Sequence, residues 1–94
     1  MTHHLKCWTG SFQAIARGDK RHEIRSIKDR VFEVGDSLII NEFIPEVTDK
    51  GVATDQDGST KGLMTGASLL RVVTYVTKPG SWGLPDDICV LSIK

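Results

Sequence analysis

The fold can be worked out from one stretch, residues 18–25, Gly-Asp-Lys-Arg-His-Glu-Ile-Arg. Gly18 is typical of a residue that ends a helix in the left-handed conformation, because it has no Cβ. After it, Glu23 and Arg25 share one face of an extended chain and Ile24 takes the other, which is the period of a strand. The stretch therefore predicts a helix before residue 18 and a strand over residues 20–27.

Upstream of this stretch, the sequence predicts a short strand followed by the main helix. Residues 5–8 read as the strand, with Leu5 and Cys7 on one face. The hydroxyls in residues 9–11 are typical of a helix start, where they accept from unpaired N–H groups. Phe12 and Ile15 recur at helical spacing and give the helix one apolar face.

Downstream, three further strands are predicted over residues 37–44, 69–77 and 88–93. The first of them contains the continuous apolar run 38–40, which suits a strand buried on both faces, as in a small closed barrel. Residues 45–62 are polar and predict a long mobile loop. Residues 78–87 predict a loop rich in Pro and Gly that exposes Trp82.

The composition indicates one ordinary globular domain that spans residues 1–94. Hydrophobic residues make up 39% and charged residues 26% of the chain, so it has enough apolar side chains for a core. Twelve basic and twelve acidic side chains give a net charge of zero. Strong binding to nucleic acid irrespective of sequence needs an excess of positive charge, so any such binding must use a local patch.

The two cysteines, Cys7 and Cys89, are too few for a disulfide framework and lie in apolar runs, so we expect buried free thiols. No apolar run is long enough to cross a bilayer, and the first residues lack the layout of a signal peptide. A cytoplasmic setting follows as the default. Residues 55–58 are similar to a calcium loop but lack its later acidic ligand, so neither a metal nor a cofactor is expected.

Four residues of the opening stretch, Gly18, Lys20, Glu23 and Arg25, match the signature G-x-K-x-x-E-x-R. In this the chain resembles ASCH domains, which belong to the PUA-like superfamily of small β-barrels. The resemblance extends along the chain to a small bacterial and phage ASCH-like group of RNA-binding-like proteins (DUF3850-like), through residues 4–8, 29–36, 65–66, 73–76 and 90–93. The chain departs from many relatives at Met64, where they have Tyr, and in the longer loop 45–61.

The resemblance implies an α+β, mostly-β fold: a small PUA-like β-barrel of about five strands, with one main α-helix between the first two. It also implies a cleft that binds single-stranded RNA or a modified nucleoside. In that cleft, Lys20 and Arg25 would hold phosphate and Glu23 would accept from a base amino group. The expected ligand-binding residues are Lys6, Trp8, Lys20, Glu23, Arg25, Thr65, Tyr75 and Trp82.

Several of these residues also have a plainer interpretation, and for them the sequence leaves both open. Lys20 is equally well a solvated lysine at a helix end. Glu23 and Arg25 are otherwise a surface ion pair of little energetic value. Trp8 either stacks on a base or caps one end of the core, and Tyr75 is expected to be packed with its hydroxyl near the cleft rim.

Two further functions follow from the same residues. Some relatives are small amidohydrolases that remove acyl groups from modified cytidines, and a hydrolase of this kind, or a ribonuclease, would use Lys20 and Glu23 as catalytic residues. Those relatives have Thr at the position of Glu23. The third possibility is a module that holds a protein partner through the loop 45–62.

Overall fold

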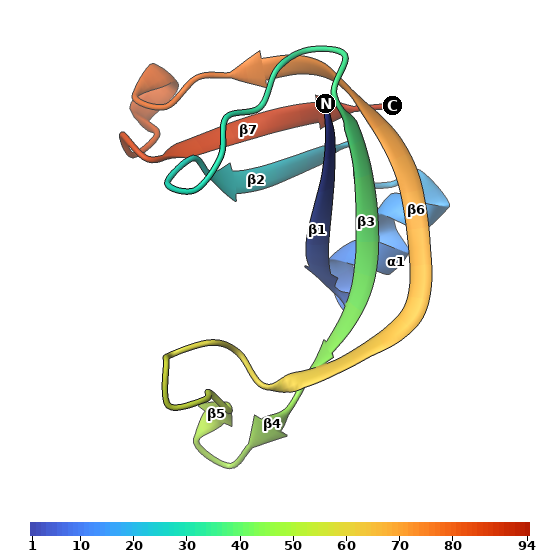
Figure 1. Cartoon of the computed structure of the whole chain (residues 1–94), viewed down its shortest axis with the longest axis vertical. Helices are drawn as coiled ribbons and strands as arrows, with labels where there is room; N and C mark the ends of the chain where they lie inside the picture. The colour runs from blue at the N-terminus through green and yellow to red at the C-terminus, as the bar shows by residue number, and fades with distance from the viewer.

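The computed structural model describes all residues, 1–94, and shows one α-helix among strands (Figure 1). The elements are β1 (Thr2–Trp8), α1 (Thr9–Arg17), β2 (His22–Ser26), β3 (Ser37–Pro45), β4 (Val47–Thr48), β5 (Gly51–Val52), β6 (Gly62–Thr77), a 3₁₀ turn (Ser81–Gly83) and β7 (Ile88–Ile93). The prediction of a mostly-β α+β fold with one helix between the first two strands is confirmed. This helix is neither long nor apolar enough to cross a membrane.

Five strands form one mixed sheet in the order β1-β3-β6-β7-β2. The β1–β3 pair is parallel and the other pairs are antiparallel. The long strand β6 curves, so that its first part pairs with β3 and its last part with β7 (Figure 1). The end strands β1 and β2 share no backbone ladder, so the curled sheet is not closed into a barrel by backbone hydrogen bonds.

The core fills the space between the curled sheet and α1. Strands contribute every second residue, because successive side chains of a strand point to opposite faces. The helix adds the two apolar residues that lie one turn apart on its inner face. The core residues are Leu5, Cys7, Phe12, Ile15, Phe32, Leu38, Ile40, Val73, Cys89, Leu91 and Ile93. Both cysteines are buried free thiols, as predicted.

The sequence predicts the C-terminal end of α1 correctly but not its N-terminal end. Gly18 ends the helix at φ 84°, and its N–H donates to the carbonyls of Ala14 and Ile15, as predicted. At the other end no side chain caps the helix, so the prediction of a hydroxyl cap is wrong. The hydroxyl of Thr9 donates instead to the carboxylate of Glu42 on β3, at 2.6 Å.

The predicted loop between β3 and β6 is an extended arm (residues 46–61). Val47 pairs with Val52 in the β4–β5 ladder, and a bridge joins Thr54 to Thr60 (Figure 1). At the base of the arm, a Cβ on Gly62 would collide with the carbonyl of Ile44 and the ring of Phe43. Glycine at this position therefore lets β6 start directly beside β3.

Two further expectations about β6 are wrong. The strand begins at Gly62 rather than at Leu69, because pairing with β3 continues across an irregularity that breaks the alternation. Near the other end, the register with β7 shifts between Val73 and Tyr75. This bulge turns Tyr75 outward, and it is 63% exposed rather than packed.

Candidate functional site

Strand β2, which carries the motif, exposes its apolar residue and buries a charged one, the reverse of an ordinary amphipathic strand. Its apolar residue Ile24 is 57% exposed, whereas the side chain of Glu23 is only 4% exposed. The alternation itself is as predicted, since Glu23 and Arg25 share one face. The face with the charged pair is therefore the inner one, and the interpretation of this pair as a surface ion pair is wrong.

The carboxylate of Glu23 is held mainly by Arg25. Arg25 donates to Oε2 twice, from Nε at 2.9 Å and from Nη2 at 2.8 Å. The other oxygen, Oε1, has weaker neighbours: the thiol of Cys7 at 3.9 Å and the ammonium of Lys20 at 4.0 Å. A buried carboxylate is costly unless it is paired, and the two cations supply that pairing. Oε1 thus retains capacity to accept a further hydrogen bond.

The ammonium of Lys20 is positioned by the first turn of α1. Lys20 Nζ donates to Ser11 Oγ at 3.0 Å, which fixes it beside the Glu23 carboxylate. Sequence reasoning did not find Ser11, because it lies in the helix start and outside the motif. The only hint in the sequence that Ser11 meets Lys20 is Gly18, which ends the helix and lets the chain turn back along it.

The motif residues line a cleft of about 300 Å³ between α1, the end of β1 and β2. The lining residues are Lys6, Cys7, Trp8, Ser11, Lys20, Glu23, Ile24 and Arg25. Trp8 is 45% exposed, so its ring is partly accessible at the cleft. Burial, and then the nearby Glu23 carboxylate, raise the pKa of the Cys7 thiol, so this group acts as a weak donor rather than as a thiolate. We name this site the motif cleft.

The structure brings five of the eight expected ligand residues into the motif cleft and leaves three elsewhere. Thr65 instead donates to Glu42 Oε1 at 2.8 Å. Hydrogen bonds from Thr9, Gln13 and Thr65, in that order of effect, hold the pKa of Glu42 below its usual range. Tyr75 lies outside the cleft, and so does Trp82, which is 95% exposed in its turn.

Another buried carboxylate, that of Asp36, lies just before β3 and beside the start of β1, and sequence reasoning also missed it. Asp36 Oδ2 is 2.8 Å from His3 Nε2 and accepts the N–H of Glu33 at 2.9 Å, while Oδ1 accepts the amino terminus of Met1 at 3.1 Å. The contact with His3 is the main reason that the pKa of Asp36 is lowered to about 2. No group of three or more His, Cys, Asp or Glu side chains is arranged to hold a metal ion.

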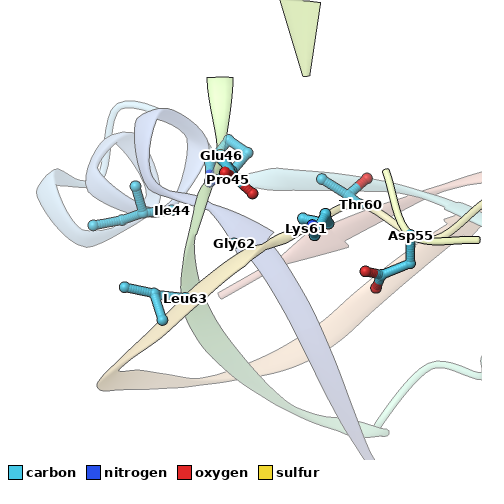
Figure 2. A pocket seen from close by; sticks show the side chains of 8 residues that line it. All are labelled: Ile44, Pro45, Glu46, Asp55, Thr60, Lys61, Gly62 and Leu63. Carbon is cyan, nitrogen blue, oxygen red and sulfur yellow. The ribbon is translucent and has the colours of Figure 1, made fainter. Parts of the chain in front are cut away.

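A larger hollow of about 500 Å³ lies at the base of the arm (Figure 2). Ile44 and Leu63 project on one side of it, and Thr60, Lys61 and Asp55 lie on the other (Figure 2). None of its charged side chains takes part in an ion pair within the chain. Recognition sites rely on polar groups held in place by their neighbours, so the smaller motif cleft is the better candidate.

The fold and the motif cleft define a class: a small mostly-β protein with a buried, arginine-held carboxylate between a helix and an edge strand. The chain belongs to the family described as "Domain of unknown function (DUF3850)", which matches residues 2–93. No curated protein matches the chain.

Proposed function

We propose that this protein is a binding module that recognises single-stranded RNA or a modified nucleoside in the motif cleft. The observation that carries the proposal is the Glu23 carboxylate, which is fixed by Arg25 through one oxygen and has spare acceptor capacity on the other. A carboxylate held in this way accepts well from the exocyclic amino group of a base such as cytosine. Unpaired bases offer that group on their Watson–Crick edge.

The other cleft residues supply the remaining contacts that a nucleotide needs. The side chains of Lys20 and Arg25 are each 24% exposed, so they are reachable by a phosphate. The Nη1 nitrogen of Arg25 remains available to donate to a phosphate, because Nε and Nη2 already donate to Glu23. The partly exposed ring of Trp8 offers a face on which a base can stack.

The likeness of residues 18–25 to the ASCH signature supports the same proposal, since ASCH domains are associated with RNA. We infer further that the curled sheet is a PUA-like barrel. The support for this inference is that one side chain bridges the gap between β1 and β2: Arg25 Nη2 donates to the carbonyl of Lys6 at 2.8 Å.

A ligand panel tests the proposal. Purified protein is melted in the presence of the four nucleosides, acylated cytidines and short RNA oligomers, because a ligand that binds only the folded state raises the melting temperature. The key variant is Glu23→Gln, which keeps the shape of the side chain and removes its charge. We expect it to lose about tenfold in affinity for ligands that carry an amino group. The matched control is Glu33→Gln at an exposed glutamate, and equal behaviour of the two variants would refute the role of Glu23.

A hydrolase that removes acyl groups from modified cytidines is the second candidate, and one contact favours it. Lys20 Nζ lies 3.0 Å from the Ser11 hydroxyl, and a lysine beside a hydroxyl occurs in some acyl-transfer enzymes. The Lys20–Glu23 separation of 4.0 Å is longer than a hydrogen bond. The unmodified protein should hydrolyse an N4-acylated cytidine to the free acid and cytidine. The Ser11→Ala variant should not. Absence of turnover by both proteins rules the candidate out.

A protein partner held by the arm is the third candidate. Apolar side chains are exposed there, namely those of Val47 and Val52. A variant in which residues 47–60 are replaced by a short turn should lose the partner and keep the fold. Retention of partner binding in that variant would exclude the arm as the docking element.

A further inference from the structure

Strand β1 is an edge strand, and its alternate residues face in opposite directions. Met1 O accepts from Ser37 N–H, and Leu5 O accepts from the Asn41 side chain, so odd-numbered residues turn their backbone towards β3. Because the direction alternates along a strand, His4 and Lys6 turn both their N–H and C=O groups to the free edge. The sheet offers these two residues no partner strand on that side.

Two arginines cover the carbonyls of this free edge. Arg30 Nη1 donates to His4 O at 3.3 Å, and Arg25 Nη2 donates to Lys6 O at 2.8 Å. The acceptors of the edge are therefore occupied, while the N–H groups of His4 and Lys6 still point outward. The result is an edge that presents donors and positive charge, and whose carbonyls at these two residues each already accept from an arginine.

A second depression, of about 370 Å³, lies along this edge and shares Lys6 and Arg25 with the motif cleft. Its lining residues are His4, Leu5, Lys6, Arg25, Ser26, Asp29, Arg30 and Phe32. We call the two depressions together the β1 groove. Four cations line the groove against two carboxylates, which leaves two positive charges in a chain whose net charge is zero.

We propose that the β1 groove binds the phosphodiester backbone of a single-stranded oligonucleotide, with a phosphate seated beside Arg30 and the N–H of His4. The proposal rests on the proposed function, which places a base in the motif cleft, and extends it to a second subsite. An added peptide strand needs acceptors as well as donors along the edge, whereas a phosphate only accepts. The edge therefore fits a polyanion better than a β-strand, which would have to displace both arginines from the carbonyls.

The subsite has one competing negative charge. Asp29 Oδ2 lies 3.6 Å from Arg30 Nη2, a separation longer than a hydrogen bond. The Asp29 side chain is largely exposed, so it can turn into water when a phosphate approaches. The phosphate would then gain the guanidinium and a backbone N–H together, as oxyanions do at other backbone donor sites.

The first test compares cytidine monophosphate with tetracytidylate, as RNA and as DNA, by isothermal titration calorimetry at two salt concentrations. Arg30→Ala should weaken tetranucleotide binding about tenfold and leave the mononucleotide unchanged. It should also flatten the slope of log affinity against log salt by about 0.7. The matched control is Arg17→Ala, since Arg17 is an exposed arginine that pairs with nearby Asp19 and lies outside the groove.

The second test isolates the backbone N–H of His4. Proline is tolerated at an edge position whose N–H points away from the sheet, so His4→Pro removes this donor while the hydrogen bonds between β1 and β3 are kept, and His4→Ala controls for the loss of the imidazole. We expect the proline variant to bind the tetranucleotide several-fold more weakly than the alanine variant, as about 1 kcal/mol per hydrogen bond implies. In the unmodified protein, the amide signals of His4 and Lys6 should shift on titration more than that of Leu5. These signals need no variant and remain informative if His4→Pro does not fold.

The outcomes separate this inference from the proposed function. Mononucleotide binding that depends on Glu23, with tetranucleotide affinity unaffected by Arg30→Ala and by His4→Pro, would overturn the second subsite and leave the motif cleft in place. Absence of binding by either ligand would overturn both. Loss of tetranucleotide affinity in Arg30→Ala, with mononucleotide binding unchanged, supports the inference. In that case, equal affinity of the unmodified protein for the RNA and DNA tetranucleotides would show that the subsite reads phosphate alone, and a preference for RNA that Arg30→Ala removes would show that it also contacts the 2′-hydroxyl.

Discussion

Arg25 holds the buried carboxylate of Glu23 with two hydrogen bonds, at 2.9 and 2.8 Å, from a position two residues further along the same strand. The same Nη2 atom also donates to the carbonyl of Lys6 on β1. One guanidinium therefore orients the candidate recognition group and joins the two end strands of the sheet. The site and the fold share this residue, so its removal should affect both.

The first prediction concerns stability. Arg25→Ala leaves the Glu23 carboxylate buried with Lys20 as its nearest cation, and breaking such a pair should lower the free energy of unfolding by about 3 kcal/mol. Urea denaturation measures this change. The double variant Glu23→Gln, Arg25→Ala removes the uncompensated charge, so it should be more stable than Arg25→Ala alone. The exposed Arg21→Ala serves as control, and a loss as large as that of Arg25→Ala would contradict the assignment.

The second prediction uses the two tryptophans of the chain. Trp8 lines the motif cleft and Trp82 does not, so a base that stacks in the cleft should quench Trp8 only. Trp82→Phe should keep both the quenching and the affinity. Trp8→Phe should lose the quenching and about tenfold in affinity, because stacking contributes about 1–3 kcal/mol per base. A titration with cytidine monophosphate, followed by tryptophan fluorescence, measures the quenching. Loss of quenching in Trp82→Phe would show that Trp8 is not the stacking residue.

The elements that local pattern specifies were predictable from the sequence. The period of two in β2 gives the shared face of Glu23 and Arg25, and Gly18 ends α1 at the expected residue. Alternation does not say which face is buried, however. That depends on Arg25 reaching both Glu23 and Lys6, which are close only in the folded chain.

The errors have equally specific causes. Strict alternation along β6 predicts the wrong face for Tyr75, because a bulge adds a residue that no sequence pattern marks. The polar composition of the arm predicts a loop, although Val47-Thr48 and Gly51-Val52 flank a two-residue turn and are typical of a short hairpin. Ser11 and the Glu42 network join residues far apart in the chain, and such contacts follow from tertiary packing.

The third prediction concerns Thr65, which the structure ties to Glu42 rather than to the motif cleft. Thr65→Val keeps the shape of the side chain but removes the donor at 2.8 Å from Glu42 Oε1. We expect a melting temperature lower by about 5 °C, because the carboxylate loses one of its three donors. Nucleotide affinity should stay unchanged, since Thr65 does not line the β1 groove. Weaker binding at unchanged stability would show instead that Thr65 contacts the ligand.

The fourth prediction concerns acid stability and Asp36. The pKa of Asp36 is lowered from its ordinary 3.8 to about 2, chiefly by His3, so the unfolded chain takes up this proton first as the pH falls. The contribution of Asp36 to stability is therefore complete above pH 3.8 and is lost between pH 3.8 and 2. Asp36→Asn removes the titrating carboxylate, so urea denaturation at pH 5, 3 and 2 should show a smaller loss of stability on acidification than in the unmodified protein. The exposed Asp19→Asn should behave like the unmodified protein. If Asp36→Asn loses stability as steeply as the control between pH 5 and 2, the His3–Asp36 pair is not formed in solution.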